Sequence, residues 1–230
     1  MFMICSKCLM QLELPFDAST YVERPGGRNV SSRRRRTLAD GEQFVLPGCG
    51  IRQIENLFFC LQPPTAAAAQ ADDLARRFGL TYGLRGRIRG GRLYHASLHG
   101  IGTYDTVPPA LSKRAVEVAR TVRMRPFDVR FDRIMSFANK DNNNPLVLLG
   151  GGDLSVLWEF YGRLGDALRY AGFKRIQKSF TPHMTLLYDS RLVPETPVPP
   201  VVWTVRNFAL VHSPYGQSRH KRIVSFRLSE

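Results

Sequence analysis

The sequence has no long hydrophobic run. A transmembrane helix needs about 20 consecutive apolar residues, and no stretch of this chain has that character. Residues 1–14 are apolar in places, but Glu13 and two cysteines interrupt them, which argues against a secretory signal. We therefore expect no contact with a membrane and a cytoplasmic location.

Cysteine is scarce, with four residues in the whole chain. Cys5 and Cys8 have the spacing of half a zinc site or of a redox pair, but no second pair or Cys/His partner follows at a suitable distance. Cys60 lies in the apolar run from Leu57 to Leu61, which is typical of a buried, unreactive thiol. We therefore expect no disulfide framework, no bound metal and no cofactor.

Acidic residues are few. The chain has 19 Asp and Glu against 33 Lys and Arg, a formal net charge of +14. Residues 1–55 hold eight basic and six acidic residues, so +12 of this charge falls in residues 56–230. An excess of this size attracts polyanions, and the arginine fork suits phosphate. It favours a nucleic-acid partner, with a merely solubilising surface as the alternative.

The first 53 residues differ from the rest of the chain. They contain Pro25-Gly26-Gly27 and the run Ser31-Ser32-Arg33-Arg34-Arg35-Arg36, and they show no helical or strand periodicity. We expect residues 1–53 to form a flexible basic N-terminal extension. The alternative is a basic arm that helps to hold RNA. Residues 54–230 are then the folded domain.

From Asn56 onward the hydrophobic pattern is regular and predicts an α+β fold. Thr65 is the expected N-cap of the first helix, which Gly79 should end. A proline-rich loop is expected from Pro194 to Pro200. The expected helices span 65–78, 108–122 and 153–171, and the expected strands lie near 57–61, 93–101, 127–131, 146–149, 180–188, 202–211 and 222–228.

Two of the five histidines begin the same short motif. His95-Ala96-Ser97-Leu98 and His183-Met184-Thr185-Leu186 both read His-x-Ser/Thr-Leu, and each lies in an expected strand. Alternate residues of a strand point to one face, about 6.5 to 7 Å apart. Each motif therefore places an imidazole beside a hydroxyl, while its leucine turns towards the core.

Two such motifs across a cleft have the groups that phosphoester chemistry needs. One neutral imidazole can accept a proton while a second, protonated imidazole donates one. The hydroxyls can donate hydrogen bonds to phosphate oxygens. An ordinary histidine pKa of about 6.5 suits both roles near neutral pH and predicts a bell-shaped pH profile. The alternative is that both are ordinary strand histidines, paired with backbone groups.

The chain from about Asn56 to Leu228 resembles the 2H phosphoesterase superfamily, and within it most closely the RNA 2',3'-cyclic phosphodiesterases, also called 2'-5' RNA ligases. The opening apolar strand from Asn56, the first motif at His95 and the segment Phe180-Thr181-Pro182-His183-Met184-Thr185-Leu186 carry this resemblance. It implies a bilobal, duplicated fold over residues 54–230, with two antiparallel sheets facing a central cleft and helices on the outer faces.

The resemblance also implies an activity. This is metal-independent hydrolysis of an RNA or nucleotide 2',3'-cyclic phosphate to a 2'-phosphate, with a possible reverse 2'-5' RNA ligation. His95 and His183 would be the catalytic acid–base pair, and Ser97 and Thr185 would bind the phosphate. Close bacterial relatives often have an arginine five residues after the second histidine, where this chain has Tyr188. A phenol has no guanidinium charge, so this departure bears on substrate preference and on ligation.

The expected partners are RNA ends or cyclic nucleotides, and the expected state is a monomer. Arg87, Arg89 and Arg92 precede the first motif and, with Tyr188, are candidate RNA contacts. A solvated loop is the alternative for these arginines. A second hypothesis for the whole chain is a non-catalytic RNA-binding module of the same fold.

Overall fold

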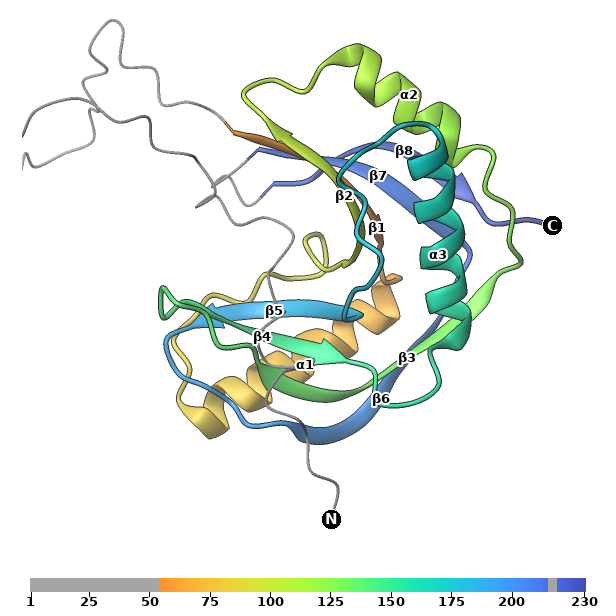
Figure 1. Cartoon of the computed structure of the whole chain (residues 1–230). Helices are drawn as coiled ribbons and strands as arrows, with labels where there is room; N and C mark the ends of the chain where they lie inside the picture. The colour runs from red at the N-terminus through yellow and green to blue at the C-terminus, as the bar shows by residue number, and fades with distance from the viewer. Residues whose placement is uncertain (1–53, 215–218) are drawn as a thin grey trace, which may run out of the picture. The chain divides into compact units, whose positions relative to one another are not determined.

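The computed structural model describes residues 54–214 and 219–230. The expected N-terminal extension, residues 1–53, and the Cys5–Cys8 pair lie outside the described residues. Within the described part, eight strands and three helices follow one another (Figure 1). They are β1 (Glu55–Leu61), α1 (Thr65–Tyr82), β2 (Ala96–Tyr104), α2 (Pro109–Ala119), β3 (Phe127–Ser136), β4 (Asn144–Leu149), α3 (Ser155–Tyr170), β5 (His183–Asp189), β6 (Thr196–Val205), β7 (Asn207–Pro214) and β8 (Lys221–Arg227).

The eight strands form one antiparallel sheet in the order β6-β3-β4-β5-β2-β1-β7-β8. The α+β class is confirmed, whereas the expectation of two separate sheets is wrong. The reason is that β2 and β5 begin side by side and pair at Ala96 and Met184. This single pair joins two four-stranded halves, β6-β3-β4-β5 and β2-β1-β7-β8. A strand–helix–strand order recurs in β1-α1-β2 and β4-α3-β5, but duplication of the fold stays a prediction.

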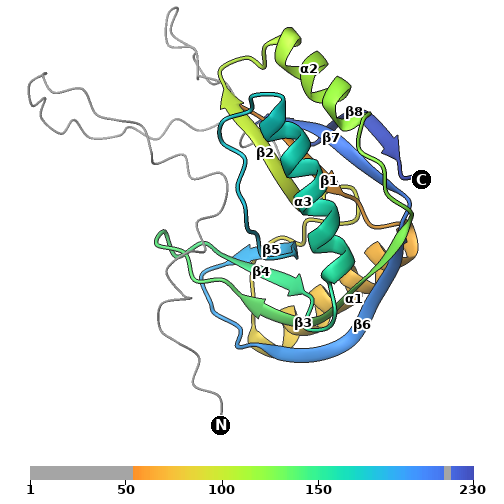
Figure 2. The ribbon, with the colours of Figure 1, turned by 45° about the vertical axis from the view of Figure 1, so that its right-hand side comes forward.

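The helices lie against the strands as Figures 1 and 2 show. Helix α1 contacts β5 and β6, α3 contacts β2 and β3, and α2 packs against α3. The side chain of Tyr94, which points away from the face of its neighbour His95, donates a hydrogen bond to Asp72 of α1. On β2, His99 stacks on Tyr161 of α3. Helices α1 and α3 therefore cover the face of the sheet opposite the motif histidines.

Strand β6 corrects two sequence expectations. From Thr196 onward, the segment expected to be a proline-rich loop is the first half of this strand, and the strand expected near 202–211 is divided at Arg206 into β6 and β7. Proline cannot donate a ladder hydrogen bond, so it is confined to edges and strand ends. Among the described strands, β6 pairs only with β3, and its other edge therefore tolerates the prolines of the segment Thr196-Pro197-Val198-Pro199-Pro200.

The ends of α1 also differ from expectation. The helix continues through Gly79 to Tyr82 and stops at Gly83, which adopts a left-handed conformation with φ of 62°. Glycine carries no Cβ and accepts this conformation readily, so the stop falls there. Thr65 is the first helical residue, and the capping position is Pro64, which makes no side-chain capping bond.

The core follows the apolar residues of the strands. Leu57, Phe59 and Leu61 of β1 are fully buried. Cys60 is buried as well, and burial raises the pKa of its thiol to about 12, as expected for an unreactive cysteine. None of the helices in the described residues is long and apolar enough to cross a membrane.

Candidate active site

The pairing of Ala96 with Met184 brings the two motifs together. Both side chains are buried and point towards the core. Neighbouring residues of a strand point to opposite faces, so His95, Ser97, His183 and Thr185 project from the other face. In an antiparallel pair this register sets each histidine beside the hydroxyl residue of the other strand, with the histidines diagonally opposed at about 7–8 Å. All four side chains are half-buried.

Each motif histidine is held by the backbone in the same way. Nδ1 of His95 donates a hydrogen bond to the carbonyl oxygen of Leu93 over 2.8 Å, and Nδ1 of His183 donates to that of Thr181 over 2.7 Å. A carbonyl oxygen can only accept, so Nδ1 carries the proton in both rings. The tautomer leaves Nε2 of each neutral ring with a lone pair for proton transfer.

An aromatic ring packs against each histidine. Phe58 of β1 lies 5.3 Å from His95 and Phe137, just after β3, lies 5.2 Å from His183, measured between ring centroids. Burial, followed by the nearby His220, lowers the pKa of His95 from 6.5 to about 3, and burial lowers the pKa of His183. Both rings are therefore neutral near pH 7 in the absence of a bound anion.

A third histidine, which the motif did not indicate, lies beside the first. The ring of His220, which precedes β8, meets the ring of His95 edge-on with centroids 4.8 Å apart. Burial and the charge of Arg89 lower the pKa of His220 to about 4. Its Nδ1 is buried and has no hydrogen-bond partner within the described residues. No local sequence signal identifies this residue, because the pairing of β8 with β7 brings it to the site.

The candidate RNA contacts occupy different surroundings. Arg87 and Arg92 are exposed, whereas Arg89 is half-buried. The guanidinium of Arg89 lies over the ring of Tyr188, with Cζ 5.6 Å from the ring centroid. Its charge contributes to the lowered pKa values of His95 and His220, which places it near both rings.

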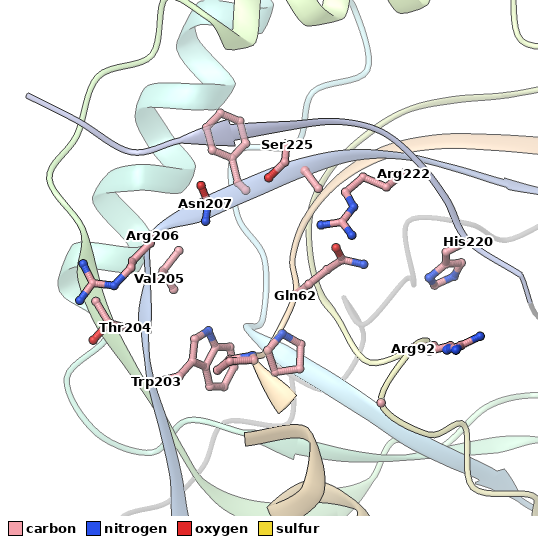
Figure 3. A pocket seen from close by; sticks show the side chains of 15 residues that line it. Gln62, Arg92, Trp203, Thr204, Val205, Arg206, Asn207, His220, Arg222 and Ser225 are labelled. Carbon is pink, nitrogen blue, oxygen red and sulfur yellow. The ribbon is translucent and has the colours of Figure 1, made fainter. Parts of the chain in front are cut away.

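A pocket of about 620 Å³ has His220 in its lining (Figure 3). His220 and Arg92 lie on one side of it, and Arg206 and Trp203 lie on the other. His220 also contacts His95 of the motif face. Three arginines give it a positive charge, namely Arg92, Arg206 and Arg222.

Several residues near the motifs belong to the core instead. The register of β2 against β1 shifts by one residue between Ser97 and Gly100, and His99 turns to the core face there. There its Nε2 bonds to the carbonyl oxygen of Tyr161 over 2.8 Å. Phe180 stacks on Tyr161, with ring centroids 3.9 Å apart. Among residues 54–214 and 219–230, no group of three or more His, Cys, Asp or Glu side chains is arranged to hold a metal ion.

The fold and the site define a class of protein: a mixed α/β domain whose sheet carries two His-x-Ser/Thr motifs on one face. The sequence model of the 2'-5' RNA ligase superfamily matches residues 57–215. The chain therefore belongs to the 2'-5' RNA ligase superfamily, within the 2H phosphoesterases. No curated protein sequence matches it.

Solved structures share the fold. The apo structure of E. coli LigT has a TM-score of 0.61 at 20% identity, covering 77% of this chain and 99% of LigT. The structure of E. coli LigT complexed with 3'-AMP has a TM-score of 0.60 at 19% sequence identity and covers the same shares of the two chains. The structure of TT0787 of Thermus thermophilus has a TM-score of 0.58 at 21% sequence identity. The match covers 75% of this chain and 97% of TT0787.

Proposed function

We propose that this phosphoester-processing chain is a metal-independent cyclic phosphodiesterase. Its substrate is an RNA or nucleotide 2',3'-cyclic phosphate, and its product is the 2'-phosphate. The observation that carries the proposal is the common Nδ1–carbonyl bond of His95 and His183 on one face of the sheet. Two rings held in the same tautomer, beside two hydroxyls, provide a base, an acid and donors for the phosphate.

The proposed reaction is an in-line attack of water on phosphorus. One neutral histidine removes a proton from the attacking water at Nε2. As the new phosphorus–oxygen bond forms, the bond from phosphorus to the 3' oxygen breaks. The other histidine, protonated, gives its proton to that leaving oxygen. Ser97 and Thr185 donate hydrogen bonds to the non-bridging oxygens, where negative charge increases in the transition state.

The acid must be protonated even though its pKa is lowered in the free protein. A bound phosphodiester carries one negative charge between the two rings. An opposite charge at this distance favours the imidazolium, so substrate binding raises the histidine pKa values. The binding of substrate thus prepares the acid. In ligation, a ribose hydroxyl would replace water as the nucleophile, the 3' oxygen would again leave, and the two histidines would keep these roles.

We further propose that the strand of RNA leads away from the cyclic end over the basic groups beside the site. Arg87 and Arg92 are exposed, and Arg92 lines the same pocket as His220. Arginine is suited to backbone phosphates, and the net charge of +14 favours encounter with RNA. The LigT structures complexed with 3'-AMP and ATP support a nucleotide ligand.

A non-catalytic RNA-binding module is the second candidate, and the substitution of arginine by Tyr188 favours it. The two functions separate in one experiment on the full chain. An oligoribonucleotide ending in a 2',3'-cyclic phosphate is incubated with protein and EDTA, and its affinity is measured in parallel. Formation of a 2'-phosphate supports the phosphodiesterase. Tight binding without any product supports the binding module, and activity that needs an added divalent ion contradicts metal independence.

A further inference from the structure

Arg89 brings an unpaired positive charge to the edge of the motif face. Its Nε is buried, and no hydrogen-bond partner for it is found among the described residues. No Asp or Glu in this part of the chain forms a salt bridge with it. A buried N–H group is costly unless a hydrogen bond compensates it. The surroundings of Arg89 therefore fit an anion that arrives from outside the chain.

The position of this charge is tied to the histidines. Arg89 contributes to lowering the pKa of both His95 and His220, and this requires its guanidinium to lie within electrostatic reach of their rings. His95 and His220 are themselves in contact. An anion compensating Arg89 would thus also lie beside the proposed catalytic pair.

The segment that carries Arg89 is fastened to β5. The amide nitrogen of Arg89 donates to the carbonyl oxygen of Leu186 over 2.9 Å. Earlier in the same segment, the amides of Arg85 and Gly86 both donate to Oδ2 of Asp189, over 2.6 and 2.8 Å. Leu186 belongs to the second motif, so Arg89 is held in a fixed relation to His183 and Thr185.

Tyr188 supplies a platform for the side chain. A guanidinium over an aromatic face is attracted by the ring and adopts a defined orientation, while its N–H donors stay free for another partner. The main chain approaches closely here, because a Cβ added to Gly86 would lie 1.9 Å from the carbonyl oxygen of Tyr188. Only glycine permits this approach, which sets the segment directly over β5.

We infer that Arg89 is a phosphate-binding residue of the site, held in place by Tyr188 as a positioning residue. It would donate two parallel hydrogen bonds to non-bridging oxygens and supply the positive charge that Ser97 and Thr185 lack. That the bound phosphate belongs to a cyclic phosphate rests on the proposed function. Arg89 differs from Arg87, two residues earlier, because Arg87 is exposed whereas the Nε of Arg89 is buried.

The first test measures binding of inorganic phosphate by calorimetry, without turnover. We expect Arg89→Met to weaken phosphate binding by about tenfold or more, because a charge-assisted pair is lost. The control Arg85→Met removes the same charge from an exposed position of the same segment and should bind like the wild type. Equal affinity of Arg89→Met and the wild type would overturn the inference.

The second test measures hydrolysis of the cyclic phosphate oligonucleotide. Arg89→Met should lower kcat/KM by about 100-fold, as for the loss of one preorganised donor to the transition state. The double variant Arg89→Met/Tyr188→Arg returns a guanidinium to the neighbouring position and should recover at least about tenfold of this loss. If Arg89→Met is unfolded by circular dichroism, Arg89→Lys keeps the charge without the fork and should still weaken phosphate binding. Unchanged binding by Arg89→Lys would then contradict bidentate recognition.

The outcomes also separate this inference from the proposed function. If the wild type forms no product but its phosphate binding depends on Arg89, the anion site stands and the phosphodiesterase proposal fails. If the wild type hydrolyses the substrate and Arg89→Met does so equally well, the proposed function stands and the role of Arg89 is wrong. A loss of stability in Arg89→Met with normal phosphate binding would show that the guanidinium merely packs on Tyr188.

Discussion

Ala96 of β2 and Met184 of β5 are cross-strand partners, and theirs is the one pair that joins these strands within the described residues. Each follows a motif histidine directly. Because both are buried on the core face, with exposed fractions of 1% and 0%, the residues on either side of them project from the opposite face. The geometry of the proposed site thus depends on two apolar side chains that touch no substrate.

A larger side chain at Ala96 should disturb this junction. We predict that Ala96→Leu lowers the free energy of unfolding by about 1–3 kcal/mol, because extra methylene groups overfill a packed core. It should also reduce hydrolysis, since the motifs move apart. Urea denaturation and kcat/KM measure the two effects. Ala66→Leu, on an exposed position of α1, is the matched control and should change neither. Wild-type activity in Ala96→Leu would show that the site does not depend on this pair.

The pH dependence of the reaction should reflect the lowered histidine pKa values. Catalysis needs one neutral and one protonated ring, so kcat/KM, which reports the free protein, peaks between the two pKa values. Burial lowers both below 6.5, to about 3 for His95. The optimum of kcat/KM is therefore predicted on the acid side of pH 6.5. The optimum of kcat should lie at higher pH, because the bound anionic phosphate raises both values.

The pH profiles of kcat and kcat/KM test both the paired histidines and the raised pKa values in the complex. A kcat/KM that continues to rise above about pH 8 would contradict paired histidine catalysis. Coincident optima for kcat and kcat/KM would contradict a raised pKa in the complex. Measurements with EDTA present keep adventitious metal from contributing.

His220 should influence the titration of His95. Its ring lies 4.8 Å from that of His95 and contributes to lowering the pKa of His95. We predict that His220→Asn removes this effect and shifts the NMR titration midpoint of His95 to higher pH. His212→Asn is the control, because His212 pairs with Glu55 and is not among the groups that shift His95. An unchanged or lower titration midpoint of His95 in His220→Asn would contradict the effect of His220 on His95.

Local pattern was sufficient to find the motif strands and their orientation. The alternation in His95-Ala96-Ser97-Leu98 predicts that Leu98 turns to the core, and Leu98 is 4% exposed. Leu186 of the second motif is fully buried. Tyr94 also points away from the motif face, as alternation predicts. These features depend on a period of two residues along one strand, which the sequence carries directly.

Features that depend on pairing between distant segments could not be predicted in this way. The prolines of 196–200 read as a loop because nothing local shows that β6 would occupy an edge of the sheet. His220 has no motif of its own and reaches His95 through strands β7 and β8. Among the arginines before the first motif, only tertiary contact with Tyr188 distinguishes Arg89 from Arg87. The two halves of the sheet are joined by the pairing of Ala96 with Met184, and the alternation of residues within a strand does not indicate which strand it will pair with.

The central claim is that His95 and His183 act together on a cyclic phosphate. Its most direct test is single-turnover conversion of an oligoribonucleotide 2',3'-cyclic phosphate to the 2'-phosphate in EDTA by the wild type, His95→Ala and His183→Ala. His212→Ala is the control. We predict conversion by the wild type and the control, and a rate at least about 100-fold lower in each of the other two variants. Conversion at the wild-type rate by either His95→Ala or His183→Ala would contradict the paired-histidine mechanism.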